Sequence, residues 1–218
     1  LKKVPVANEQ LMSNENKNAI LDKQVIITIS REYGSGGRYI GKLVADRLGI
    51  KLYDKEFVEK LAEDTGLSAE YIENNEQKRK PLEILNNGYY SGLNNSDELF
   101  IKESELIKEV TANESCVIIG RCADFILKDR ENVVKVFVSS DMEDKIKRAT
   151  EYYGLDKKNA EKEINRINKL RATHYKYYTE RDWRDSTNYD LCINSDKIGV
   201  ENAANLIYEI VEQKEKEL

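Results

Sequence analysis

Short apolar runs alternate along this chain with segments whose apolar positions repeat at helical spacing. Near-continuous apolar runs are typical of strands buried on both faces, so we expect an α/β fold with a parallel sheet between helices. A last amphipathic helix is expected from residue 199 to about 214, with Leu206 and Ile207 in its buried stripe. The expected strands lie near residues 25–30, 51–53, 116–119, 133–138 and 189–194.

Two long segments interrupt this alternation, and both read as helical insertions. The first runs from about 54 to 114, and the second from about 141 to 185. A length of 218 residues fits one domain with insertions. We therefore expect a single domain over residues 24–218, preceded by an N-terminal arm at 1–23 that shows no clear period.

Composition narrows the class of protein. Forty Asp and Glu against 35 Lys and Arg argue against non-specific binding to nucleic acid. No apolar run approaches the roughly 20 residues that cross a bilayer, which predicts no membrane partner. The polar start lacks the apolar core of a secretory signal, and three isolated cysteines show neither disulfide nor zinc spacing. We expect a cytoplasmic protein without a metal site of its own.

Charge is distributed unevenly along the chain. Residues 145–184 hold twelve Lys and Arg but only six Asp and Glu. Such a basic segment suggests an anionic ligand, although a solvated helix laced with charge pairs would give the same composition. The single histidine, His174, lies here among aromatic residues, where packing at the surface is a better explanation than catalysis.

A glycine-rich segment joins the first expected strand to a helical pattern at 38–48. The unpaired N–H groups of a helix N-terminus attract anions, and glycines let the chain close around a polyphosphate. Strand, glycine loop and helix in this order therefore predict a phosphate cradle. A tight turn that binds nothing would use glycines as well.

The loop departs from the common nucleotide-binding signature, which is Gly, four residues, then Gly-Lys-Ser/Thr. Counted back from Gly36, the first glycine position holds Arg31. The lysine position holds Gly37, and the hydroxyl position holds Arg38 or Tyr39, depending on register. The pattern thus keeps the glycines of a cradle and lacks its lysine.

Other polar residues directly follow the expected strands. Because ligands of open parallel sheets lie beyond the carboxyl ends of the strands, these residues are candidates for a site. They are Arg31, Asp54, Arg121, Asp124 and Asp141. Arginines can bind phosphate oxygens, and carboxylates can hold Mg²⁺ or a sugar hydroxyl. The three aspartates could instead stabilise helix N-termini.

Four segments in this order carry a family resemblance. They are Arg-Glu-Tyr-Gly-Ser-Gly-Gly-Arg at 31–38, Tyr-Asp-Lys-Glu at 53–56, Gly-Arg-Cys-Ala-Asp at 120–124 and Tyr-Asp-Leu-Cys-Ile-Asn at 189–194. Together they resemble the cytidylate kinase-like family, a divergent branch of the P-loop nucleoside monophosphate kinases. The resemblance covers about residues 24–214.

The resemblance implies a P-loop kinase fold with a five-stranded parallel core. An acceptor-binding insertion would follow the second strand, and a lid insertion would follow the fourth. The implied reaction moves the γ-phosphoryl group of ATP, with Mg²⁺, to a nucleoside monophosphate, CMP or dCMP by family name. Small-molecule nucleotides would be the partners.

The resemblance also implies roles for particular residues. The loop around Gly34, Ser35, Gly36 and Gly37, flanked by Arg31, Arg38 and Tyr39, would hold ATP, with Arg38 near the missing lysine. Asp54, Arg121, Asp124 and Lys169 would serve the acceptor side, with Arg121 on its phosphate. Arg171, with Arg166 and Lys169 nearby, would close over the transferred group. Arg38, Arg166 and Arg171 are thus the expected catalytic residues.

Departures from typical CMP kinases leave two alternatives open. Cys122 replaces the aspartate of Gly-Arg-Asp, and Asn168 replaces the lid aspartate three residues before Arg171. Both positions are expected to contact the acceptor. The chain could therefore phosphorylate another small metabolite, or it could be a nucleotide-binding sensor with little turnover.

Overall fold

The computed structural model describes residues 23–54, 57, 59 and 95–218. Five strands form one sheet in the order β2-β3-β1-β4-β5, and every neighbouring pair is parallel. The strands are β1 Ile26–Arg31, β2 Lys51–Tyr53, β3 Cys116–Ile119, β4 Val133–Ser139 and β5 Leu191–Asn194. The five-stranded parallel sheet predicted from the sequence is confirmed.

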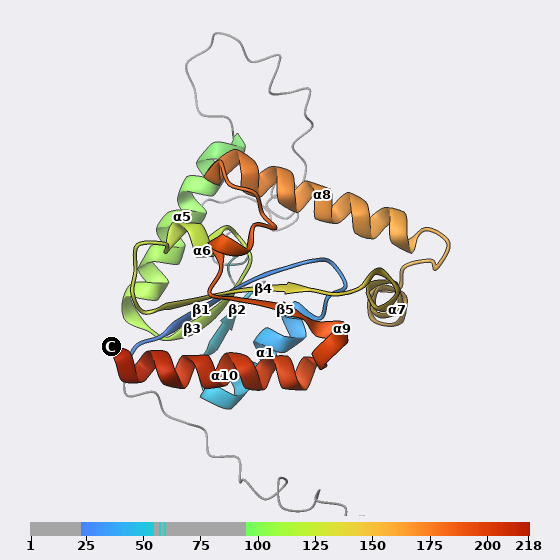
Figure 1. Ribbon diagram of the computed structural model, residues 1–218. Helices are drawn as coiled ribbons and strands as arrows, with labels where there is room; N and C mark the ends of the chain where they lie inside the picture. The colour runs from blue at the N-terminus through green and yellow to red at the C-terminus, as the bar shows by residue number, and fades with distance from the viewer. Residues whose placement is uncertain (1–22, 55–56, 58, 60–94) are drawn as a thin grey trace, which may run out of the picture.

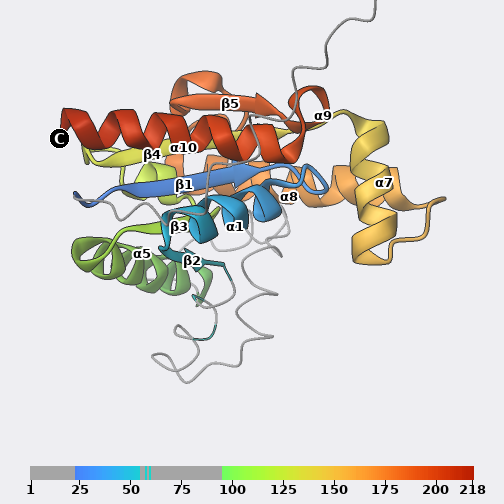
Figure 2. The same ribbon diagram turned by 90° about the horizontal axis from the view of Figure 1, so that it is seen from below.

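Helices cover both faces of the sheet (Figures 1 and 2). Helices α1 and α10 lie on one face, and α5, α6 and α8 lie on the other. Helix α7 stands beyond the carboxyl end of β4. The helices are α1 Gly37–Leu48, α5 Asn95–Asn113, α6 Ala123–Ile126, α7 Met142–Tyr153, α8 Ala160–Thr179, α9 Ser195–Ile198 and α10 Val200–Glu217, with a 3₁₀ turn at Ser186–Asn188.

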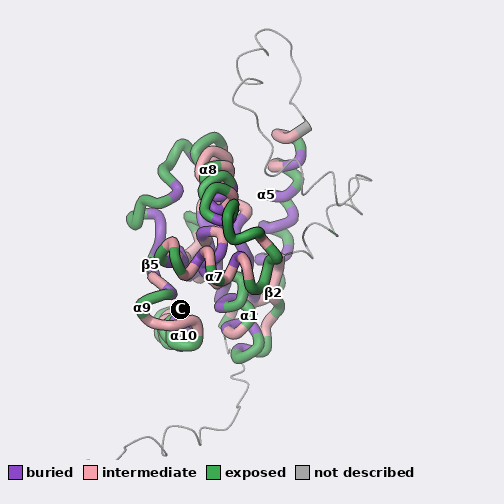
Figure 3. The backbone as a smooth tube through the Cα atoms, turned by 90° about the vertical axis from the view of Figure 1, so that its right-hand side faces the viewer, coloured by how far each residue is buried: buried purple, intermediate pink, exposed green. Residues whose placement is uncertain are grey.

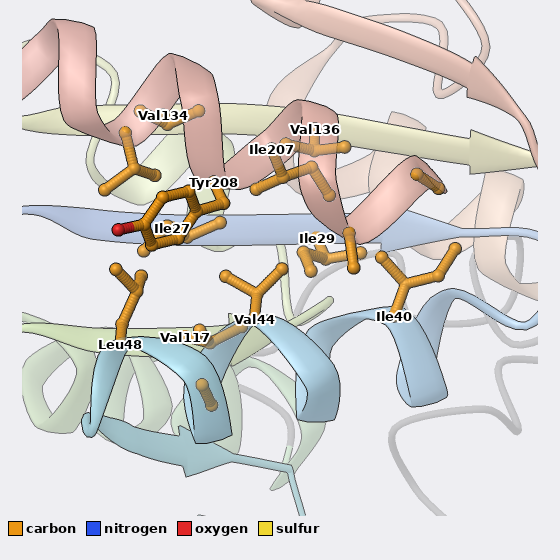
Figure 4. Close-up of a cluster of buried hydrophobic side chains, with 14 of the residues drawn as sticks. Ile27, Ile29, Ile40, Val44, Leu48, Val117, Val134, Val136, Ile207 and Tyr208 are labelled. Atoms are coloured by element: carbon orange, nitrogen blue, oxygen red, sulfur yellow. The ribbon is translucent and has the colours of Figure 1, made fainter. Parts of the chain in front are cut away.

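One apolar core fills the space between the sheet and the pair α1 and α10 (Figure 4). Ile27 and Ile29 of β1 are fully buried there, against Val44 of α1 and Ile207 of α10. Burying each such side chain contributes about 1.5–3 kcal/mol relative to leaving it in water. Leu206, expected in the buried stripe of α10, is 41% exposed instead.

The opposite face carries a second core, in which the intervening residues of the same strands are buried. Ile26 and Ile118 pack there against Phe57 and Ile107. Burial on both faces explains why β1 and β3 read as continuous apolar runs rather than as alternating ones. Among the described residues, no helix is long and apolar enough to span a bilayer.

The structure describes parts of both segments that we expected to be insertions. Within 141–185, the chain forms α7 and α8 between β4 and β5. Within 54–114, the structure describes Asp54, Phe57, Glu59 and α5, and the rest of this segment lies outside the described residues. Residues 1–22 of the expected arm lie outside them as well. Figure 3 looks toward the carboxyl ends of the strands, where α7 and α8 combine buried and exposed positions.

Candidate active site

A cavity of about 580 Å³ opens at the carboxyl ends of the strands. Its wall combines the loop after β1, Asp54 after β2, residues 119–122 at the end of β3 and side chains of the 141–185 insertion. Small-molecule sites typically occupy such concave volumes of 300–1,000 Å³. Residues far apart in sequence therefore meet at one place large enough for a nucleotide.

The glycine loop takes a conformation that requires glycine. Gly34 and Gly36 have φ of +80° and +79°, values that side chains disfavour. A Cβ on Gly34 would also lie 2.8 Å from the carbonyl oxygen of Lys145. The loop then enters α1, whose first amides have no acceptor inside the helix. These N–H groups and the helix dipole favour an anion at this end of α1.

The 141–185 insertion packs directly on this loop. The amide of Tyr33 donates to Oδ1 of Asn168 at 2.7 Å, and Nη1 of Arg171 donates to the carbonyl oxygen of Arg31 at 3.0 Å. The ring of Tyr153 lies 5.2 Å from that of Tyr33. Helices α7 and α8 therefore hold the backbone of the loop from the side opposite the sheet.

A buried ion-pair cluster strengthens this contact. Glu32 is 8% exposed and accepts from Nζ of Lys145 at 2.6 Å and from Nη2 of Arg184 at 2.8 Å. Lys145 belongs to α7 and is buried as well. One loop carboxylate thus joins two cations of the insertion, so the loop and the insertion form one packed unit.

Two arginines reach the cavity close together, from β1 and from α8. Arg31 and Arg171 both line it, and burial together with the nearby charge of Arg31 lowers the pKa of Arg171. A lowered pKa means that the protonated guanidinium is destabilised where it stands. An anion in the cavity would relieve this destabilisation, so the pair favours a negatively charged ligand.

A third arginine, Arg121, is fixed by neighbours on the other side of the cavity. It forms an ion pair with Glu103 of α5, and its Nη2 donates to the carbonyl oxygen of Asp54 at 3.2 Å. Gly120, Arg121 and Cys122 all have positive φ, between 53° and 74°. Strained backbone of this kind clusters at functional sites because the surroundings impose it. Here it sets the direction of the Arg121 side chain.

Comparison with known proteins gives this geometry a family. Residues 26–197 match the model of the cytidylate kinase-like family. The chain belongs to this family. This family consists of kinases, so family membership supports a phosphotransferase. The fold is that of the P-loop kinases.

Three individual proteins are similar to this chain to different degrees. A cytidylate kinase of Archaeoglobus fulgidus is 26% identical over 190 residues, covering 86% of this chain and 95% of the relative. An uncharacterised protein of Eubacterium ventriosum is 31% identical, with a TM-score of 0.68 over 87% of this chain and 99% of that one. Shikimate kinase of Bacteroides thetaiotaomicron shares the fold, with a TM-score of 0.54 and 16% identity over 86% of this chain and 98% of that one.

Most of the site residues that we predicted from the sequence line the cavity. Those that line it are Arg31, Gly34, Gly36, Gly37, Arg38, Asp54, Arg121 and Arg171. The Nε of Arg38 lies 2.5 Å from Oδ2 of Asp54, so this arginine forms an ion pair with another residue that lines the cavity. His174, which we expected to pack at the surface, also lines the cavity.

Five predicted residues do not line the cavity. Ser35 is buried within the loop, and Tyr39 is 51% exposed. Arg166 and Lys169 lie on the exposed side of α8, where Arg166 pairs with Glu163. Asp124 is buried in the first turn of α6.

The surroundings of Asp124 explain its position. Its carboxylate accepts from the hydroxyl of Tyr175 at 2.6 Å and from that of Ser30 at 3.3 Å, and both of these residues line the cavity. Burial raises the pKa of Asp124, and the two hydrogen bonds oppose that shift. Asp124 therefore supports the cavity wall from behind.

Sequence reasoning missed two carboxylates of the site, Glu32 and Glu103. Glu103 lies on α5 in helical register with Leu99, Leu106, Ile107 and Val110, which are all buried. An acid within an apolar stripe is a signal, because a buried carboxylate requires a cationic partner. Nothing in the sequence near Glu103 identifies Arg121 as that partner.

Proposed function

We propose that this protein transfers the γ-phosphoryl group of ATP to a nucleoside monophosphate, with CMP or dCMP as the leading acceptor. One observation carries the proposal: in a member of the cytidylate kinase-like family, the glycine loop and arginines from β1, the end of β3 and α8 surround a single cavity. Phosphoryl transfer depends mainly on positioning and on stabilising negative charge. These residue types supply both.

The donor side of the site is the loop together with the lid. The amides of residues 34–37 would hold the ATP phosphates at the start of α1. Arg171 would engage the transferring group, because its side chain already lies in the cavity wall and is half-buried. We infer that 141–185 acts as the lid and that the contacts of Asn168 and Arg171 to the loop describe its packed position.

The acceptor side is formed by Asp54, Arg121 and Glu103. Arg121 would bind the acceptor phosphate, and its ion pair with Glu103 would hold the guanidinium in place before the acceptor arrives. In the described part of the chain, no group of three or more His, Cys, Asp or Glu side chains could hold a metal. Mg²⁺ would enter with the ATP phosphates, because phosphates and waters supply most of its ligands in kinase sites.

A coupled assay of ADP release over a panel of nucleoside monophosphates tests this function. We expect ATP- and Mg²⁺-dependent turnover with CMP or dCMP above the rate without acceptor. Turnover with another nucleoside monophosphate would keep the reaction and change the acceptor. ADP release that no nucleoside monophosphate stimulates would contradict the proposal.

Two alternatives rest on departures in particular residues. Gly37 in the lysine position favours a nucleotide sensor, for which calorimetry would detect ATP binding without turnover. Cys122 in the place of an acceptor-side aspartate favours a kinase for another small metabolite. Adding shikimate to the panel of acceptors tests one such case, which the fold of the shikimate kinases suggests.

A further inference from the structure

The two unusual positions of the glycine loop contact each other in space. Arg31 occupies the place of the first glycine in the common signature, and Gly37 occupies the place of the lysine. A Cβ on Gly37 would lie 2.6 Å from Cβ and 3.2 Å from Cγ of Arg31. An ordinary side chain at position 37 therefore collides with the stem of Arg31. The two departures are complementary: an arginine enters at one position, and a glycine makes room for it at the other.

The far end of the same side chain reaches the cavity past a second glycine. A Cβ on Gly120 would lie 2.0 Å from Nη1 of Arg31, so the guanidinium occupies the space that a side chain at position 120 would take. Nη2 of Arg31 lies 4.0 Å from Oδ1 of Asp54. Two glycines from different segments thus define the path of Arg31 from the base of the loop to the cavity wall.

We propose that Arg31 supplies the phosphate-binding cation that the loop lysine supplies in the common signature. The inference rests on the proposed function, in that the phosphates are those of ATP. Arg31 begins at the end of β1 and passes beneath Gly37, so its guanidinium enters the cavity from the strand rather than from the helix. Arginine can bind phosphate oxygens with two parallel hydrogen bonds, and it remains protonated at neutral pH.

Arg38 is the other candidate for this role, and its surroundings differ. Its side chain is 51% exposed, against 22% for Arg31, and it lies closer to the shared carboxylate of Asp54, at 2.5 Å against 4.0 Å. Arg31 also lies beside Arg171, which donates to the carbonyl oxygen of Arg31, and burial together with the charge of Arg31 lowers the pKa of Arg171. The lid arginine and the strand arginine are therefore adjacent, as two groups that share one polyphosphate would be.

A matched pair of neutral substitutions separates the two arginines. Arg31→Met keeps a stem beneath Gly37 and removes the charge, and Arg38→Met removes the charge of the rival. We expect calorimetric affinity for ATP to fall about 10- to 100-fold in Arg31→Met, as for the loss of a charged hydrogen bond, and to fall several-fold less in Arg38→Met. Arg31→Lys should keep more affinity than Arg31→Met. Equal or larger loss in Arg38→Met would overturn the inference.

An exchange of the two positions tests the packing argument. Gly37→Lys alone should weaken ATP binding and lower the melting temperature, because the lysine Cβ meets Arg31. Arg31→Gly alone should weaken ATP binding without that clash. The double variant Arg31→Gly/Gly37→Lys recreates Gly, four residues, Gly-Lys, and should recover at least about tenfold of the affinity lost in Arg31→Gly. A folded double variant that binds ATP no better than Arg31→Gly would overturn the inference.

Because these tests measure ATP affinity rather than turnover, they are distinct from the test of the proposed function. Wild-type protein that binds ATP but phosphorylates no nucleoside monophosphate would refute the function, and the variants would still decide the role of Arg31. Normal turnover in the wild type with unchanged ATP affinity in Arg31→Met would refute the role and leave the function standing. A wild type that binds no ATP would refute both.

Discussion

Helices α7 and α8 carry similar polar side chains on two sides, one facing the glycine loop and one facing solvent. On the side facing the loop, Lys145, Asn168 and Arg171 are buried or lie in the cavity wall, and each contacts a loop residue. On the side facing solvent, Arg166 pairs only with its helical neighbour Glu163 among the described residues. The basic residues of this segment therefore fall into two groups. One group contacts the loop, and the other lies on the solvent-facing side of the helix.

The buried ion pair on the loop side should give the largest effect. In Glu32→Gln, the Lys145 ammonium would remain buried beside Arg184 without its carboxylate. Removing one partner of a buried pair costs about 3–5 kcal/mol in free energy of unfolding. Urea denaturation measures this loss. The matched control is Glu163→Gln on the outer side, which should change stability by less than about 0.5 kcal/mol. A loss below about 1 kcal/mol in Glu32→Gln would mean that water reaches the pair.

The two arginines of α8 should differ next most strongly, in turnover. Arg171→Ala removes a guanidinium from the cavity wall, and we expect kcat to fall by about 10² or more, with a smaller change in ATP affinity. Arg166→Ala removes a side chain that is 57% exposed, so kcat should stay at the wild-type value. Steady-state kinetics with the best acceptor, with folding checked by circular dichroism, measures both. Equal loss in the two variants would remove the distinction between the sides.

The sequence contained enough to separate these two arginines. Ile164, Ile167, Asn168, Arg171 and Tyr175 repeat at helical spacing, and all but Arg171 are buried. A polar residue within such a stripe faces inward, whereas Arg166 and Lys169 fall outside the stripe. The count of charged residues over 145–184 does not show this pattern, because it does not distinguish the two sides of a helix.

The strands could also be predicted from local residue patterns. Several contacts between distant residues could not. Burial on both faces gives β1, β3 and β4 apolar runs that need no knowledge of their neighbours. In contrast, Glu32 meets Lys145 across 113 positions of the chain. Such a pairing follows from how the insertion packs on the sheet, and no local pattern encodes it. The contact of the Arg31 stem with Gly37 is local, but it depends on the backbone path of the glycine loop, which the residue pattern does not give.

The amide side chain of Asn168 should have an intermediate effect. It is 3% exposed and accepts from the Tyr33 amide, and within the described structure its Nδ2 has no hydrogen-bond partner. Asn168→Ala would leave the Tyr33 amide without its acceptor, at a cost of about 1–3 kcal/mol in free energy of unfolding. Lys169→Ala, one residue along on the outer side, should cost less than about 0.5 kcal/mol. Thermal or urea unfolding of the two variants measures this difference, and equal costs would contradict the hydrogen bond between α8 and the loop.

The smallest expected effect lies in the outer pair of Glu163 and Arg166, whose titration sharpens the comparison. The hydrogen bond from Arg166 lowers the pKa of Glu163 below its usual 4.5. The folded state therefore favours the ionised carboxylate, so the pair contributes stability above the unfolded pKa and loses it as pH falls through the folded pKa. Because Arg166 is 57% exposed and Glu163 33%, a double-mutant cycle of Glu163→Gln and Arg166→Gln should give a coupling of about 0.3–0.5 kcal/mol at pH 7, smaller in 1 M salt. Near pH 2 the coupling should disappear. A coupling above about 1 kcal/mol at pH 7, or one that survives 1 M salt, would show that this side of α8 is shielded from water in solution. The contrast between the two sides of α8 would then fail.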